Sequence, residues 1–245
     1  MIFKKINEDG LVVLGCGKMG SALMSGWLNQ GLDPRAVWIL DPKPSEWLVS
    51  QDIHLNENLP ENPAVVIVAV KPQMMETALP ELQNFGSGTT LFISVAAGIT
   101  IAAFEEVLGG ATPIVRTMPN TPASVGHGIT ALIGNGNATK DDLAEAERLM
   151  AAVGQTIILE NESQMDAVTG VSGSGPAYLF HMIETLTQAG RKQGLSLDIA
   201  TKLATATVAG AGALAIQSNE TATQLRKNVT SPNGTTQAAL EILMN

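Results

Sequence analysis

Residues 11–20 read LVVLGCGKMG, and Ser21-Ala22-Leu23-Met24 follow without a break. A short apolar run that ends in a glycine turn and opens a helical pattern is typical of a dinucleotide-binding strand, turn and helix. Gly15 allows the tight turn, Gly17 lets the backbone approach a pyrophosphate, and Gly20 lets helix and strand pack closely. The anion would lie at the helix N-terminus, where unpaired N–H groups and the helix dipole favour negative charge. Because glycine turns are common, a plain structural turn is the alternative.

The amino-acid composition and net charge indicate which classes of protein and partner fit this chain. The chain has 245 residues, 45% of them hydrophobic and 15% charged, which predicts a soluble globular protein with two domains rather than one. A net charge of −9 and an aromatic content of 4% argue against nucleic acid and anionic membranes as partners. Cys16 is the one cysteine, so no internal disulfide is possible and a reducing compartment fits. Within the glycine turn we expect this cysteine to be a small apolar filler.

Targeting signals are not evident in the sequence. The N-terminus is mixed and charged, with no apolar stretch like that of a signal peptide. We expect no later segment of membrane-spanning length, and therefore a cytoplasmic protein with no membrane partner.

Strand-like runs alternate with helical stretches over the first two-thirds of the chain. The expected strands are 11–14, 36–40, 64–70, 90–95, 113–117, 130–133 and 155–159, and the expected helices are 21–30, 72–82, 101–108 and 140–153. For the last of these helices, Thr139 can cap the start and Gly154 can end it. Such alternation predicts an α/β fold with a mostly parallel sheet covered on both faces.

From about Ser163 the pattern becomes helical. Helices are expected at 176–193, 198–217 and 235–244, and no strand-like run follows. Residues 203–214 are small and apolar on all sides, and a helix without a polar face is buried. In so small a domain that burial calls for a second subunit. The sequence therefore predicts a dinucleotide-binding domain over residues 1–160 and an all-α dimerisation and substrate-binding domain over residues 161–245.

Three further loops follow expected strands, where a doubly wound sheet places its ligands. Lys71, in Ala69-Val70-Lys71-Pro72, can approach a cofactor phosphate or ribose, although an ordinary strand–helix corner is the alternative. The small residues of Ser94-Val95-Ala96-Ala97-Gly98 let a flat nicotinamide ring lie against the backbone. In Arg116-Thr117-Met118-Pro119-Asn120-Thr121-Pro122 two prolines fix the path, and Asn120 offers donors and an acceptor to the cofactor.

Two glycine-rich loops precede helices in the C-terminal part. The N–H groups of residues 171–176 could hold an anion, and residues 229–236 add two threonine hydroxyls that suit a carboxylate. Each loop could instead be only a capped helix start.

Six motifs occur in order along the chain: GCGKMG, AVKPQ, SVAAG, RTMPNTP, GVSGSGPAY and LRKNVTSPNGTT. Together they resemble the pyrroline-5-carboxylate reductase family over nearly the whole chain. The resemblance implies a Rossmann-like, doubly wound domain followed by a helical domain that interlocks with its partner in a homodimer. It implies hydride transfer from NAD(P)H to the C=N carbon of 1-pyrroline-5-carboxylate, giving L-proline. A reductase of a related imine and a non-catalytic dinucleotide-binding dimer are the alternatives.

The resemblance also implies functional residues. Those expected to line the cofactor site are Gly15, Cys16, Gly17, Lys18, Met19, Gly20, Ala69, Val70, Lys71, Pro72, Ala97, Gly98 and Asn228. Those expected to hold the substrate are Ser231, Gly234, Thr235 and Thr236, with the Thr236 hydroxyl as the catalytic group that meets the ring nitrogen. We expect no metal site, and no catalytic role for His54, His127 or His181.

Two positions depart from the family pattern. Asp41 closes the second expected strand, where a carboxylate accepts the ribose hydroxyls of NADH and repels the 2′-phosphate of NADPH. We therefore favour NADH slightly, although Lys43 and Ser45 could still receive a phosphate and the family leans to NADPH. Asn233 stands where a glycine is usual, and asparagine tolerates a positive φ.

Overall fold

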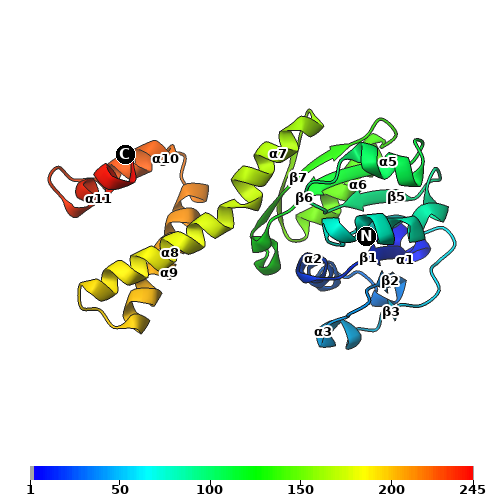
Figure 1. The fold of residues 1–245 in the computed structure, drawn as a ribbon, viewed down its shortest axis with the longest axis horizontal. Helices are drawn as coiled ribbons and strands as arrows, with labels where there is room; N and C mark the ends of the chain where they lie inside the picture. Colours follow the sequence, from blue (N-terminus) through cyan, green and yellow to red (C-terminus); the bar gives the residue numbers. More distant parts are fainter. Residues whose placement is uncertain (1–2, 245) are drawn as a thin grey trace. The chain divides into compact units, whose positions relative to one another are not determined.

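The computed structural model describes residues 3–244, which form two compact units divided between Pro176 and Ala177. The first unit is α/β and the second is helical (Figure 1). Each unit is described here by itself.

The first unit is built on a sheet that has eight strands within the described residues, in the order β3-β2-β1-β4-β5-β6-β7-β8. The strands are β1 (Leu11–Leu14), β2 (Val37–Leu40), β3 (His54–Leu55), β4 (Val65–Val68), β5 (Leu91–Ser94), β6 (Ile114–Met118), β7 (Gly128–Gly134) and β8 (Gly154–Ile158). All neighbouring pairs are parallel except β6 with β7. The predicted mostly parallel sheet is confirmed. All four residues of β1 are buried, as expected for a parallel strand covered on both faces.

Helices cover both faces of this sheet (Figure 1). They are α1 (Lys4–Asp9), α2 (Lys18–Asn29), α3 (Glu46–Val49), α4 (Met75–Ala78), α5 (Ile101–Leu108) and α6 (Lys140–Ala151). The short α7 (Met165–Val168) comes after β8. On one face α2 and α6 pack together, and the buried Trp27 indole donates to the Leu149 carbonyl at 2.8 Å. On the other face α5 packs against β4 and β5 through Phe104 and Phe92. The glycine turn between β1 and α2 therefore lies at the end of a strand that is buried on both faces of the sheet.

Several local predictions need correction. The expected helix at 72–82 is divided into a 3₁₀ turn at Pro72–Met74, the short α4, and a 3₁₀ segment at Leu79–Phe85, because Pro80 lacks the N–H that an α-helix needs. The structure also adds α1, α3 and the two-residue β3, none of which the sequence patterns indicated. In contrast, α6 begins as expected, with a capping box in which Thr139 and Asp142 exchange hydrogen bonds.

The stretch at 171–176 is not the anion-binding loop that its glycines suggested. After α7 the chain continues through a π-helical turn at Thr169–Gly173 into α8 (Gly175–Lys192). The Ser174 N–H donates to the Thr169 carbonyl at 2.8 Å, as a helical N–H does. A β-carbon at Gly173 would lie 2.7 Å from Met118 Cε, so the glycine serves close packing rather than a loop.

The described residues of the second unit form helices joined by short loops. It contains most of α8, then α9 (Leu197–Gln217), α10 (Ala222–Asn228) and α11 (Thr235–Leu243). Along α9 only Ala200 and Ala204 are buried within the chain, whereas Leu203, Leu214 and Ile216 are more than half exposed. A helix whose apolar side chains are exposed to solvent in the single chain is typical of a helix that packs against a second subunit.

The expectation that no segment reaches membrane-spanning length is wrong for α9. It is 21 residues long and contains an 18-residue window with a mean hydropathy of 1.5, so length and composition alone would allow it to cross a membrane. The run of alanines, with few charges, produces this value.

Candidate active site

Four loops of the first unit meet at the carboxyl edge of the sheet. The Gly15 N–H donates to the Leu40 carbonyl at 2.8 Å, and the Ala69 N–H donates to the Leu14 carbonyl at 2.8 Å. The loop after β5 joins them through the Val95 N–H, which lies 3.0 Å from the Val68 carbonyl. Ligands of open α/β sheets bind at this edge. The structure therefore brings the glycine turn, Asp41, residues 69–72 and residues 97–98 together, as predicted.

The glycine turn has the shape that a pyrophosphate needs. Gly15 has a φ of +83°, and a β-carbon there would lie 2.7 Å from Val70 Cγ1. Gly17 is exposed and is the N-cap of α2, with no side-chain cap and no heavy atom within 4 Å of where a β-carbon would stand. The start of α2 is therefore open at Gly17, and no side chain caps the N–H groups of its first turn. These residues fit a dinucleotide, because a side chain at Gly17 would fill the approach to the helix N-terminus.

Asp41 is fixed beside this turn. One oxygen of its carboxylate accepts the Cys16 N–H at 2.7 Å, and the other accepts the Lys43 N–H at 2.8 Å. The remaining lone pairs of both oxygens are free to accept ribose hydroxyls. The Asn56 side chain exchanges two bonds of 2.9 Å with the Asp41 backbone. The sequence does not indicate this role of Asn56, because its partner Asp41 lies 15 positions away and an Asn after two strand-like residues is a weak signal.

Cys16 lies inside the turn and is 4% exposed. Burial raises the pKa of its thiol from 9.0 to about 11; the contact with the Ser21 hydroxyl lowers the pKa, and the nearby Asp41 charge raises it. The thiol is therefore neutral at physiological pH, in agreement with the expected filler role.

Asn120 follows β6 and is buried. Its side-chain oxygen accepts the Ile129 N–H at 2.9 Å, and its side-chain nitrogen donates to the Ser172 carbonyl at 3.1 Å. The amide thus joins β6, β7 and the π-helical turn, and one of its N–H groups is left for a ligand.

The other predicted site residues lie in the second unit. Asn228, the last residue of α10, is exposed and bonds Glu220 at 2.9 Å and Gln224 at 2.7 Å. Asn233 has a φ of +59°, which confirms that asparagine takes the conformation expected of the usual glycine.

The loop 231–236 ends in a helix start that can bind an anion. Gly234 is the N-cap of α11 and supplies no side-chain cap to the N–H groups of the first turn. Thr235 is exposed and Thr236 is half-buried in that turn. Free backbone donors beside two hydroxyls suit a carboxylate.

Comparisons with known proteins agree with this geometry. A family model described as "Pyrroline-5-carboxylate reductase dimerisation" matches residues 162–245, and one described as "NADP oxidoreductase coenzyme F420-dependent" matches residues 10–98. The chain is 40% identical over 261 residues to a pyrroline-5-carboxylate reductase of Mycobacterium tuberculosis, covering 95% of this chain and 88% of that protein. It is 37% identical over 237 residues to the Pseudomonas aeruginosa reductase, covering 94% and 87%. The chain belongs to the pyrroline-5-carboxylate reductase family.

Solved structures of family members share the fold. A pyrroline-5-carboxylate reductase from Coxiella burnetii aligns with a TM-score of 0.86 at 35% identity, covering 96% of this chain and 90% of that one. A Plasmodium falciparum pyrroline carboxylate reductase with NADP bound aligns with a TM-score of 0.86 at 30% identity, covering 97% and 90%. The predicted Rossmann-like domain followed by a helical dimerisation domain is confirmed.

Proposed function

We propose that this chain transfers a hydride from NAD(P)H to the C=N carbon of 1-pyrroline-5-carboxylate and releases L-proline, the last step of proline biosynthesis. The observation that carries the proposal is the open glycine turn at the carboxyl edge of the sheet, in a chain that aligns with reductases of this name over 94–95% of its length. Residues 1–160 hold the cofactor, and residues 161–245 hold the substrate and pair the subunits.

The cofactor supplies the hydride, and the chain binds the cofactor and the substrate and orients them toward each other. The N–H groups of Lys18, Met19 and Gly20 face the pyrophosphate, and Lys71 and Pro72 border the site at the next loop. Ala97 and Gly98, both exposed after β5, give the nicotinamide a flat backbone surface. Asn120 and Asn228 are further proposed contacts to the cofactor through their side-chain amides.

The substrate is held by its carboxylate. Ser231, Gly234 and Thr235 offer hydroxyl and N–H donors at the start of α11, and the Thr236 hydroxyl bonds the ring nitrogen. Protonation of that nitrogen makes the C=N carbon more electrophilic. Catalysis then needs no strong acid or base in the chain, because holding the two reacting carbons in line removes most of the entropic part of the barrier.

NADH is the proposed preferred cofactor. The Asp41 carboxylate, fixed by two backbone N–H groups, lies where a ribose 2′-substituent would meet it. The Ser45 hydroxyl accepts the Leu48 N–H at 3.2 Å as the cap of α3. Its own O–H is left to donate, so Ser45 and the exposed Lys43 are the groups that could receive a 2′-phosphate.

Self-association follows from the exposed apolar residues of α8 and α9, among them Phe180, Leu203 and Leu214. A homodimer covers these side chains. We further propose that the protein works in the cytoplasm and has neither nucleic acid nor a membrane as partner.

The test is the near-ultraviolet absorbance of NADH and NADPH, measured side by side on adding pyrroline-5-carboxylate. Rapid oxidation, with a lower KM for NADH, is expected. Cofactor binding without turnover would indicate a non-catalytic dinucleotide-binding dimer, and turnover only with other cyclic imines would indicate a related reductase.

A further inference from the structure

We propose that Glu162 is a positioning residue for hydride transfer, which holds the loop 95–100 by fixing the start of α5. The inference rests on the proposed function, since it assigns a role to a residue outside the predicted site. Glu162 does not belong to any of the six motifs that carry the family resemblance.

Glu162 joins three elements through one oxygen. Its Oε1 accepts the Ile101 N–H, the first of α5, at 2.8 Å, across 61 positions of the chain. The same oxygen accepts a guanidinium N–H of Arg116 at 2.6 Å. Arg116 lies in the middle of β6 with its side chain 7% exposed. A buried guanidinium needs a counter-charge, so the carboxylate is held where both donors meet it.

The Ile101 bond matters because helix starts leave N–H groups without partners. Within α5 the Thr100 hydroxyl caps the Ala103 N–H at 3.3 Å, and Glu162 takes the Ile101 N–H. A carboxylate at this end also interacts favourably with the helix dipole. Glu162 thus determines where α5 begins, and with it where the preceding loop ends.

The loop 95–100 is anchored at its other end as well. The Ser94 carbonyl accepts the Thr117 hydroxyl at 2.8 Å, and the Ser94 hydroxyl accepts the Ala96 N–H at 3.2 Å. Between the two anchors stand Ala97 and Gly98, proposed above to support the nicotinamide. If the Glu162 anchor is lost, one end of the loop is free to shift, and a small displacement of a reactive ring lowers the hydride-transfer rate without removing the pyrophosphate contacts.

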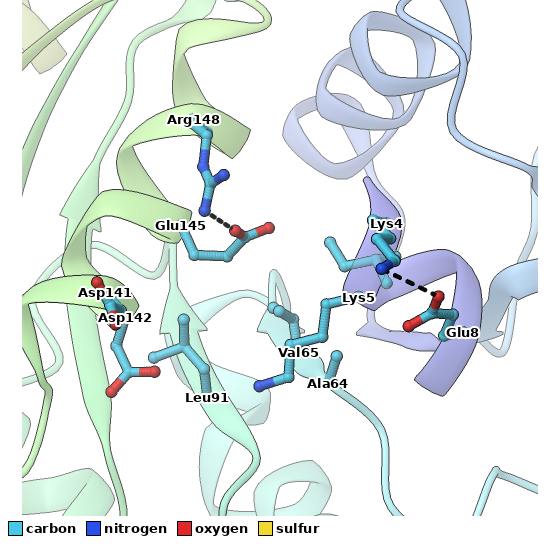
Figure 2. Close-up of a pocket in the computed structure, with 11 residues that line it drawn as sticks. Lys4, Lys5, Glu8, Ala64, Val65, Leu91, Asp141, Asp142, Glu145 and Arg148 are labelled. Carbon is cyan, nitrogen blue, oxygen red and sulfur yellow. Dashed lines mark hydrogen bonds and ion pairs between the residues drawn. The ribbon is translucent and has the colours of Figure 1, made fainter. Parts of the chain in front are cut away.

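A second Glu–Arg ion pair, which lies within one helix and has a more exposed arginine, offers a control. Glu145 pairs with Arg148 on α6, as Figure 2 shows, beside a cavity of about 420 Å³. Ala64 and Leu91 line the same cavity, at the amino ends of β4 and β5. This pair therefore lies at the edge of the sheet opposite the proposed cofactor site, and shortening its glutamate leaves the loop untouched.

The experiment compares Glu162→Asp, Glu162→Gln and the control Glu145→Asp in steady-state kinetics. Glu162→Asp keeps the charge beside Arg116 but draws the oxygen away from Ile101. We expect kcat to fall about tenfold while the cofactor KM changes less than about threefold. With cofactor deuterated at nicotinamide C4, the isotope effect on kcat should rise. Glu162→Gln keeps the length and an oxygen for the Ile101 N–H but removes the charge beside Arg116, so its kcat should lie between those of Glu162→Asp and the parent. Glu145→Asp should match the parent.

A parental kcat and isotope effect in Glu162→Asp would overturn the inference, as would an equal loss in Glu162→Gln or in Glu145→Asp. Amide hydrogen exchange on the parent protein tests the same bond without a variant: Ile101 should be protected, and exchange at the rate of an open loop would contradict the proposal. Failure of the proposed function is a separate result, because the parent protein would then not reduce the imine at all.

Discussion

The carboxylate of Asp41 accepts the backbone N–H of Cys16 at 2.7 Å. This bond ties the end of β2 to the glycine turn that follows β1. The proposed selector between NADH and NADPH is therefore a carboxylate that two backbone N–H groups, those of Cys16 and Lys43, hold beside the glycine turn.

Replacing Asp41 should change the choice of cofactor. In Asp41→Ser the negative charge is gone, so the KM for NADPH should fall relative to that for NADH by about tenfold, equivalent to roughly 1.4 kcal/mol. Asp41→Asn keeps an oxygen for the Cys16 N–H and should behave similarly. The measurement is steady-state kinetics with both cofactors. An unchanged ratio in both variants would show that Asp41 faces away from the ribose. Asp33→Asn, at the start of the 3₁₀ turn before β2, is the control.

A methyl group at Gly17 should weaken cofactor binding without harming the fold. No heavy atom lies within 4 Å of the added carbon in the protein alone, so the free energy of unfolding should change by less than about 1 kcal/mol. The dissociation constant for NADH and NADPH should rise at least tenfold, because the methyl group stands where the pyrophosphate approaches. Gly110→Ala also adds a methyl group in open space and should leave binding unchanged. Equal affinity in Gly17→Ala and the parent would exclude the turn as the pyrophosphate site.

The Cys16 thiol should make stability fall at alkaline pH. Burial raises its pKa from 9.0 to about 11, so between these values the unfolded chain loses a proton that the native protein keeps. The stabilisation is complete below about pH 9 and is lost as the pH rises through 11. The free energy of unfolding, measured by denaturant at pH 8 and pH 10.5, should fall more for the parent than for Cys16→Ala. Parallel losses in the two proteins would mean that the thiol titrates normally in the folded state.

Removing the Thr236 hydroxyl should slow the reaction more than it weakens folding. In Thr236→Ala, kcat/KM should fall by about tenfold to a hundredfold, equivalent to roughly 1.4–2.7 kcal/mol of transition-state stabilisation. Thr236→Ser keeps the hydroxyl and should recover most of the rate. Thr185→Ala removes a hydroxyl that bonds the Met182 carbonyl within its own helix, and should have little effect. A Thr236→Ala enzyme as fast as the parent would remove this residue from the mechanism.

The parts of the fold that the sequence predicted are those in which local pattern and burial agree. β1 is an unbroken apolar run because it is buried on both faces, and the glycine turn follows at once. α6 was foreseen because its cap, Thr139, and its acidic first turn are local signals. The alternation of such segments was enough to predict a mostly parallel sheet.

The parts that were missed depend on contacts between distant residues. β3 has two residues that pair with Trp38 and Ile39 of β2, and the His54 ring stacks on Trp38 with ring centroids 4.4 Å apart. Residues 171–176 look like a loop because glycine and serine are weak helix formers, yet residues 169–173 form a π-helical turn in which the Ser174 N–H donates to the Thr169 carbonyl. The roles of Asn56 and Glu162 likewise come from bonds to Asp41 and Ile101, which sequence spacing does not indicate.

The central claim, hydride transfer from the nicotinamide to the imine carbon, is tested most directly by following deuterium from the cofactor into the product. The protein is incubated with pyrroline-5-carboxylate and cofactor deuterated on the transferred face of nicotinamide C4, and the product is examined by mass spectrometry and NMR. The account predicts proline that carries one deuterium at the former C=N carbon. Intact pyrroline-5-carboxylate, or proline without the label, would contradict it.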